Sequence, residues 1–377
     1  MQSALRAGQL AKSVQSSALP LKMRAELLDY DLPEQLIAAR PLAARDGARL
    51  CMVLRDRVVH AQVRDFPSQL AAHDLLVVND TRVRKARLLC SRPRTKGGGG
   101  GRVELLFLHP KAGGSWAALG RSNRPLGPGS LLHAGELELR VVARDSEGVL
   151  TVDCDGDVDR VLQDRGAMPI PPYLKREADA QDSERYQTVY ASRLGSAAAP
   201  TAGLHFSKQL LADIEGRGVR VARVLLHVAM GTFRPVRADD LDEHPMHSEF
   251  FEVSPELAAQ IAETRQRGGR VIAVGTTAVR ALEAAADRRR RGQVIAQAGS
   301  TQLLIQPGYQ FRVVDALWTN FHQPRSTLLA LVAAFAGYER MKNAYQQAIS
   351  EEYRFLSYGD AMWIPACFSD SPDGTPR

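Results

Sequence analysis

The feature that most restricts the fold of this chain is a regular alternation of helical and extended segments after residue 200. Helices are expected at residues 207–218, 254–269 and 276–291, and apolar strands at residues 219–228 and 270–275. Ser207 and Ser254 stand at expected N-caps, and Pro255 takes the first helical position, which are favoured places for these residue types. Strands that alternate with helices are buried between them, so this half of the chain is expected to form an α/β layer.

The middle of the chain shows a different pattern, in which short strands follow one another with little helix between them. They are expected at residues 102–110, 115–120, 137–145 and 149–155. Closely spaced strands joined by glycine-rich links predict an antiparallel unit, here a small barrel. The five glycines at residues 97–101 fit a hairpin tip, because no helix follows them as a phosphate-binding loop would require.

Together these patterns predict a discontinuous three-layer α/β domain with a small antiparallel β-barrel inserted into it. The α/β domain is expected to combine residues 23–82 with residues 161–377, and the barrel to occupy residues 83–160. Residues 1–22 contain three cations and no acid, and for them we expect a disordered extension or a start codon assigned too early.

The composition is ordinary for a globular protein and argues against several classes of function. A net charge of +7 allows an RNA partner on one basic face without requiring one. The four cysteines lie far apart with no CxxC pair, so we expect reduced thiols rather than zinc ligands or disulfides. No apolar run reaches the roughly 18 residues of a membrane span, and the N-terminus lacks the apolar core of a secretory signal. We therefore expect a cytoplasmic protein without a membrane segment.

The segment "VIAVGTTAVRALEA" places a glycine and two threonines between a strand and a helix. The first turn of a helix has free N–H groups and the positive end of the helix dipole, which together can hold a carboxylate or a phosphate. The alternative is that Thr276 or Thr277 only caps the helix. GxGxxG and GxxxxGK[ST] are absent, so neither a dinucleotide-binding fold nor a P-loop is supported.

Three histidines stand at the ends of expected elements, beside threonine, glycine or asparagine: His205 in "APTAGLHF", His227 in "LLHVAMGTF" and His322 in "TNFHQPRSTL". A neutral imidazole can exchange a proton at cellular pH, and ligands of open α/β sheets gather at strand ends. For each histidine taken alone, a buried structural role is the alternative.

Two further motifs suggest binding. His244 and His247 have metal-ligand spacing, but Pro245 disfavours a regular helix there and HExxH is absent, so no metal is expected. In "NDTRVRKAR", the alternation of an extended strand places Arg82 and Arg84 on one face, where they would contact RNA phosphates.

Between Tyr30 and Ile364 the chain resembles the S-adenosylmethionine:tRNA ribosyltransferase-isomerase family of queuosine biosynthesis. The resemblance is carried, in order, by "VNDTRV", "MPIPPY", "ERYQTVYA", "AAPTAGLHF", "LHVAMGTFRPV", "MHSEFFEV", "VIAVGTTAVRALE" and "TNFHQPRSTLLALVAAFAGY". The chain has Ala229 and Met230 where the family usually has Gly-Ala or a similar pair of small residues, and Gln323 where leucine is usual.

The resemblance implies an enzyme that uses S-adenosylmethionine as a ribosyl donor. The ribosyl part would move to the aminomethyl group of a 7-deazaguanine at the wobble position of a tRNA with a GUN-type anticodon. Adenine and methionine would leave, and the product would be epoxyqueuosine in tRNA. S-adenosylmethionine is then a consumed co-substrate; no metal or redox cofactor is implied, and we expect a monomer.

The motifs of this resemblance also suggest roles for individual residues. His205 and His322 are the expected proton carriers, with Asp360 as an orienting or basic carboxylate. Thr276 and Thr277 would hold the methionine carboxylate or the ribose hydroxyls. The full set expected to bind S-adenosylmethionine is Thr201, Gly203, Gly231, Thr232, Gly275, Thr276, Thr277 and Asn320. The set expected to contact tRNA is Asp80, Thr81, Arg82, Arg84, Phe206, Phe233 and Tyr358.

Three alternatives remain open at this point. For the aromatic residues, which would stack the splayed wobble base, the alternative is core packing. For the whole chain, one alternative is a tRNA-binding module without activity. The other is an S-adenosylmethionine-dependent tRNA methyltransferase, which is disfavoured because no glycine-rich loop follows the first strand of a doubly wound unit.

Overall fold

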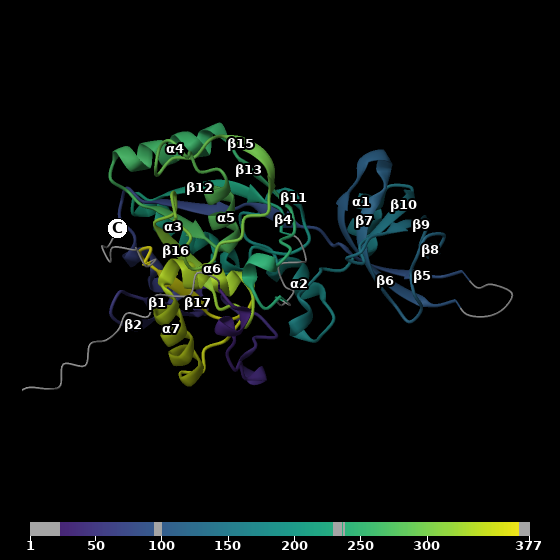
Figure 1. Cartoon of the computed structure of the whole chain (residues 1–377), viewed down its shortest axis with the longest axis horizontal. Helices are drawn as coiled ribbons and strands as arrows, with labels where there is room; N and C mark the ends of the chain where they lie inside the picture. The colour runs from purple at the N-terminus through teal and green to yellow at the C-terminus, as the bar shows by residue number, and fades with distance from the viewer. Residues whose placement is uncertain (1–22, 94–99, 229–235, 237, 369–377) are drawn as a thin grey trace, which may run out of the picture.

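The computed structural model describes residues 23–93, 100–228, 236 and 238–368. The extension expected at residues 1–22 lies outside these ranges. Figure 1 shows a large α/β body and, beside it, a smaller β body that includes β5 to β10. Within the described ranges, none of the helices combines the length and apolar character that crossing a membrane requires.

The α/β body is built on one nine-stranded sheet to which both ends of the chain contribute. In spatial order the strands are β15 (Gln297–Thr301), β13 (Glu249–Val253), β12 (Arg220–Leu226), β3 (Leu75–Asn79), β14 (Val271–Val274), β16 (Ala316–Asn320), β17 (Ala361–Ile364), β1 (Arg49–Val53) and β2 (Val58–Gln62). The central strands β12, β3, β14 and β16 are parallel, β17 runs antiparallel to β16, and β1 is parallel to β17.

Helices cover both faces of this sheet, which confirms the predicted α/β fold. Successive strand residues point to opposite faces, so Leu75 and Val77 join one core and Leu76 and Val78 the other. The first face is covered by α4 (Pro255–Gln266), α5 (Thr276–Ala284), α6 (Thr327–Ala336) and α7 (Tyr338–Ser350), and the second by α3 (Lys208–Gly216) and a 3-10 segment at Val63–Gln69.

The helix boundaries follow local signals, with one difference. The Ser207 and Ser254 side chains accept hydrogen bonds from the first turns of α3 and α4, as predicted. Helix α5 ends at Ala284 instead of continuing to residue 291. The Asp287 carboxylate accepts hydrogen bonds from the Arg289 and Arg290 N–H groups, which holds a turn that competes with the helix.

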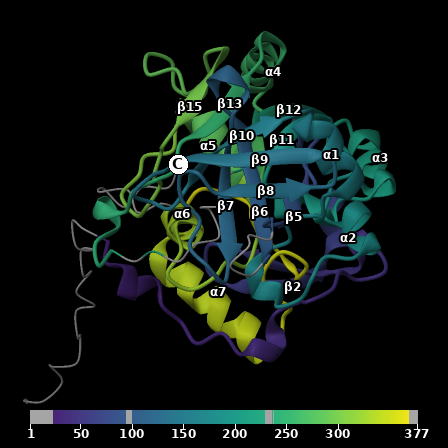
Figure 2. The same ribbon diagram turned by 90° about the vertical axis from the view of Figure 1, so that its right-hand side faces the viewer.

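The smaller body is a closed antiparallel barrel, as predicted. Ser91 of β5 pairs with Arg102 of β6, so these two strands are antiparallel neighbours, and residues 97–99 of the glycine run lie outside the described ranges. Around the barrel the strands are β10 (Leu150–Asp155), β7 (Trp116–Ser122), β6 (Arg102–Pro110), β5 (Arg87–Ser91), β8 (Leu131–Ala134) and β9 (Leu137–Arg144). Helix α1 (Val158–Arg165) packs on its core, and Figure 2 looks at the molecule from the barrel side.

Strand β4 (Thr81–Val83) precedes the barrel in the chain and pairs in parallel with β11 (Arg193–Ser196), which follows the barrel and α2 (Ala180–Arg185). Arg84 joins the two bodies: its Nε lies 3.0 Å from the Asp159 carboxylate of α1, and its guanidinium lies 4.8 Å from the Trp116 ring centre. The structure therefore places Arg84 in a domain contact, whereas Arg82 is exposed.

Candidate functional site

The candidate site lies at the carboxyl ends of the parallel strands. Val274 pairs with both Val78 and Trp318, so β3, β14 and β16 end at one edge of the sheet. Polar residues stand at these strand ends: Asn79 is the last residue of β3, Asn320 is the last residue of β16, and Thr276 begins α5 just after β14. This edge is where open α/β sheets bind ligands.

Two adjoining hollows at this edge bring most of the expected co-substrate residues together. One, of about 350 Å³, is lined by Thr201, Gly275, Thr276, Thr277, Asn320 and His322. The other, of about 330 Å³, shares Thr201, Asn320 and His322 with it. His205 lines a third hollow of about 290 Å³, with Arg45 and Tyr358.

Asn320 connects Thr201 to His205. Thr201 Oγ1 donates to Asn320 Oδ1 at 2.9 Å, and Asn320 Nδ2 lies 3.2 Å from His205 Nε2. Because an amide nitrogen only donates, His205 Nε2 accepts, and this network assigns the ring proton to Nδ1. Burial lowers the pKa of His205 to about 4, aided by the guanidiniums of Arg354 and Arg45 and opposed by a backbone hydrogen bond. His205 is therefore neutral at pH 7.

His322 lies just after β16 and is held from three sides. The ring Nε2 of His322 is 2.9 Å from Thr319 Oγ1. The backbone N–H of His322 donates to the Tyr345 hydroxyl at 2.9 Å, and its backbone carbonyl accepts from the Tyr30 hydroxyl. Burial lowers the pKa of His322 to about 3, so this ring is also neutral at pH 7. His205 and His322 thus supply two imidazoles that are neutral at pH 7.

The start of α5 is open to a ligand. Gly275 is the N-cap with φ 89°, a backbone conformation that glycine adopts without strain, and no side chain of the described residues caps the helix. Thr277 Oγ1 instead accepts from Asn79 Nδ2 at 3.2 Å. The alternative that a threonine caps this helix therefore does not hold, and the first-turn N–H groups border the hollow.

Asn79 is a central residue that the sequence analysis missed. It is fully buried; its Nδ2 also donates to the Leu226 carbonyl, and its Oδ1 accepts from the N–H groups of Leu226 and Thr81. One side chain thus ties the ends of β3 and β12 to α5. The available signal was its position as the polar last residue of an otherwise apolar strand.

Thr81 and Asp80 also support the site from within. Thr81 is fully buried, and its Oγ1 lies 2.8 Å from His227 Nδ1. Burial lowers the pKa of His227, with Arg193 and Arg84 adding to the effect. The Asp80 carboxylate accepts from the Ser192 hydroxyl at 2.7 Å. Both residues hold neighbouring segments in place, and their expected contact with tRNA stays a prediction.

Phe206 requires a correction. It is fully buried and packs edge-on against Trp318 and Phe66, so it offers no face to a base, and core packing is its role here.

Gly203 lines none of the hollows described above; a Cβ there would lie 2.0 Å from the Tyr190 hydroxyl, so close packing requires glycine. The expected residues Gly231, Thr232 and Phe233, with the departures Ala229 and Met230, lie outside the described residues.

Asp360 is held by structural contacts. Its carboxylate is 1% exposed, accepts from the N–H groups of Arg49 and Arg354, and pairs with the Arg49 guanidinium at 3.3 Å. These bonds fix the start of β1 to the segment before β17. Its expected role as an orienting or basic carboxylate stays a prediction.

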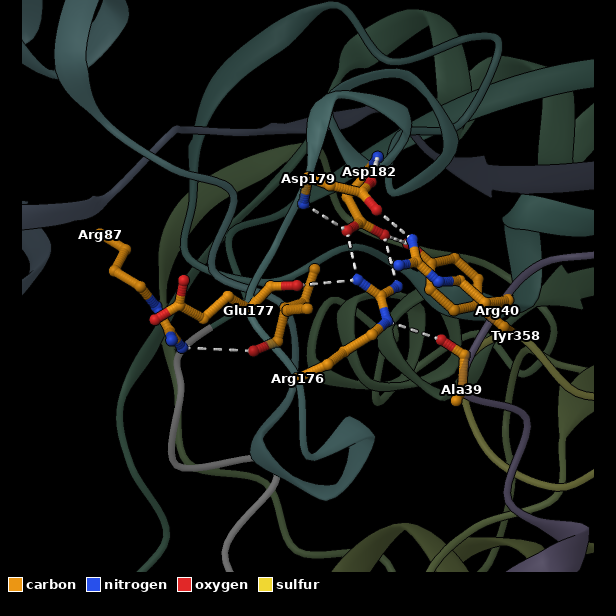
Figure 3. A network of polar contacts seen from close by, with 9 residues as sticks. Ala39, Arg40, Arg87, Arg176, Glu177, Asp179, Asp182 and Tyr358 are labelled. Atoms are coloured by element: carbon orange, nitrogen blue, oxygen red, sulfur yellow. Dashed lines mark hydrogen bonds and ion pairs between the residues drawn. The ribbon is translucent and has the colours of Figure 1, made fainter.

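Tyr358 belongs to a buried polar network, drawn in Figure 3. Its hydroxyl donates to Asp182 at 2.8 Å, and its ring meets Tyr186 edge-on. Arg176 binds the same carboxylate through two nitrogens, at 2.6 and 2.8 Å. Burial raises the pKa of Asp182, but the hydrogen bonds from Arg176, the Asp179 N–H and Tyr358 outweigh it and lower the pKa to about 2. Tyr358 is therefore fixed, with only 4% of it exposed.

The fold and the adjoining hollows define an α/β protein with an inserted barrel. Its candidate ligand site lies at the carboxyl edge of the parallel strands. A family model described as queuosine biosynthesis protein matches residues 25–364. The chain therefore belongs to this family.

Individual relatives match this chain over about nine tenths of its length. The S-adenosylmethionine:tRNA ribosyltransferase-isomerase of Sorangium cellulosum is 51% identical over 372 residues, which cover 91% of this chain and 98% of the relative. The protein of the same name from Heliobacterium modesticaldum is 48% identical and covers 91% of this chain and 100% of its own. The crystal structure of S-adenosylmethionine tRNA ribosyltransferase from Thermotoga maritima is 34% identical, covers 90% of this chain and 99% of its own, and gives a TM-score of 0.51.

Proposed function

We propose that this protein transfers and isomerises the ribosyl part of S-adenosylmethionine onto the aminomethyl group of a 7-deazaguanine at the wobble position of tRNA. Adenine and methionine leave, and epoxyqueuosine remains in the tRNA. The observation that carries the proposal is the gathering of Thr201, Thr276, Asn320 and His322 around adjoining hollows. The names of the relatives support the same reaction.

The neutral histidines favour an order for the proton steps. A sulfonium acidifies the neighbouring C–H bond, and a neutral imidazole can remove that proton to form an ylide-like carbanion. The imidazolium formed in this way can then donate the same proton to adenine as adenine departs. His322 and His205 are the candidates, and such a carrier typically contributes about 10²–10⁴-fold in rate. Both rings are neutral at pH 7, so either one can be the first to accept the proton.

The remaining parts of the proposal follow from the substrate. The aminomethyl group attacks as a neutral amine, and the wobble base is splayed out of a single-stranded loop at low cost. Arg82 is exposed and stands two residues before Arg84 of the domain contact, and it is the basic residue that we expect to meet a phosphate. A tRNA with a GUN-type anticodon, a cytoplasmic location, a monomeric state and the absence of any cofactor are parts of the same proposal.

The test is to incubate the protein with S-adenosylmethionine and tRNA bearing the aminomethyl-deazaguanine and to separate the small products. Adenine and methionine in equal amounts, with a matching gain in tRNA mass, are the expected result. S-adenosylhomocysteine would identify a methyltransferase, and the absence of any product would identify a tRNA-binding module.

A further inference from the structure

A fourth hollow borders the site and contains a buried ion pair that the proposed reaction does not yet use. Its volume is about 440 Å³. Arg280 of α5 and Glu249 of β13 supply its charged lining, His244 and His247 contribute imidazoles, and the other lining residues include Leu303 and Leu328.

The guanidinium of Arg280 is incompletely satisfied. The residue is 5% exposed; its Nε donates to the Leu303 carbonyl at 3.0 Å and its Nη1 to the Glu249 carboxylate. Its Nη2 is buried and has no hydrogen-bond partner among the described residues. A buried N–H without a partner costs free energy, so this position is suited to an acceptor that a ligand brings.

The hollow adjoins the site. Leu328 lines both this hollow and the one beside Thr276 and His322. Arg280 follows Thr276 by four residues on α5, which is about one helical turn, or about 5.4 Å along the axis. A ligand in the hollow beside Thr276 and His322 can therefore extend along α5 to Arg280.

The geometry points to the methionyl part of S-adenosylmethionine as the occupant, with Arg280 binding its α-carboxylate and Glu249 its α-ammonium group. This inference rests on the proposed function and refines it. It moves the carboxylate away from the threonine turn of α5 and leaves Thr276 and Thr277 for the ribose hydroxyls.

The chemistry of the pair selects an amino acid over a simple anion. A guanidinium binds a carboxylate through two parallel hydrogen bonds, and a carboxylate oxygen pair accepts about four, so Glu249 can hold Arg280 and an ammonium group together. The α-carbon of the methionyl part carries both charges. A tRNA phosphate carries the same sign of charge as the Glu249 carboxylate. It also has no ammonium group that could bind Glu249, so the repulsion would not be offset.

The first test needs no substitution. Binding of S-adenosylmethionine, decarboxylated S-adenosylmethionine and 5′-methylthioadenosine to the unmodified protein is measured by titration calorimetry. Without the α-carboxylate, the buried Nη2 of Arg280 has no acceptor although Arg280 stays paired with Glu249, so we expect decarboxylated S-adenosylmethionine to bind about 10–100-fold more weakly. Equal affinities for the two sulfonium ligands would overturn the inference.

The second test uses R280M, with R223M as the matched control at an exposed arginine on β12. R280M should bind S-adenosylmethionine and its decarboxylated form alike, while keeping its affinity for 5′-methylthioadenosine within about two-fold, since that ligand lacks the methionyl tail. If folded R280M still bound S-adenosylmethionine more tightly than its decarboxylated form, the inference would be overturned. If R280M does not fold, the ligand comparison above still decides.

Failure of the inference is separable from failure of the proposed function. Unmodified protein that releases adenine with tRNA but does not discriminate between the two sulfonium ligands refutes only the methionyl assignment. Unmodified protein that binds no S-adenosylmethionine refutes both.

Discussion

Acid should destabilise this protein through its buried histidines, and His322 gives the sharpest case. The ordinary pKa of 6.5 falls to about 3 on folding because burial disfavours the charged ring. Below pH 6.5 the unfolded chain takes up a proton that the folded chain refuses, so stability falls as the pH decreases from about 7 towards 3. Between pH 8 and pH 5 the loss from His322 is about 2 kcal/mol. His205, with a pKa of about 4, adds a similar loss.

Urea denaturation at pH 8 and pH 5, followed by tryptophan fluorescence, measures this loss. H322Q keeps a polar side chain beside Thr319 but cannot titrate, so its free energy of unfolding should fall by about 2 kcal/mol less than that of the unmodified protein over this range. H109Q, at an exposed histidine of the barrel, is the matched control and should match the unmodified protein. An identical loss in H322Q and the unmodified protein would refute the burial argument.

Three further predictions follow from individual contacts. H322A should abolish adenine release while S-adenosylmethionine still binds, and near-normal turnover would remove His322 from the mechanism. N79A should lower the free energy of unfolding by about 2–3 kcal/mol, because it leaves buried backbone groups of two strands without partners, and a change below about 0.5 kcal/mol in a urea titration would contradict this. R82E should weaken tRNA binding at unchanged melting temperature, with a smaller effect at high salt, whereas R84E should lower the melting temperature because the new carboxylate repels Asp159. A filter-binding series with thermal melts separates the two effects. Unchanged tRNA binding by R82E would reject Arg82 as a tRNA contact.

Local patterns were enough to predict much of the fold. The caps at Ser207 and Ser254 act within one helical turn, and the strands of the barrel alternate along a few residues, so both are visible in a short window of sequence. The end of α5 was not visible in this way, because the Asp287 turn competes with a helix-forming sequence by only a few hydrogen bonds.

The contacts within the site were harder to predict because they join distant parts of the chain. Asn79 meets Thr277 across 198 positions, and Asn320 meets His205 across 115. Strand alternation correctly places Arg82 outward, but only the folded barrel brings Asp159 to Arg84. A helical arginine such as Arg280 looks like a solvent-exposed residue until its partner on β13 is known.

A crystal structure of the protein with S-adenosylmethionine bound tests the central claim most directly. The account predicts the ribose between the start of α5 and His322, the adenine within reach of an imidazole, and the methionyl carboxylate against Arg280. A ligand seated away from the carboxyl edge of the parallel strands, with these side chains untouched, would contradict it.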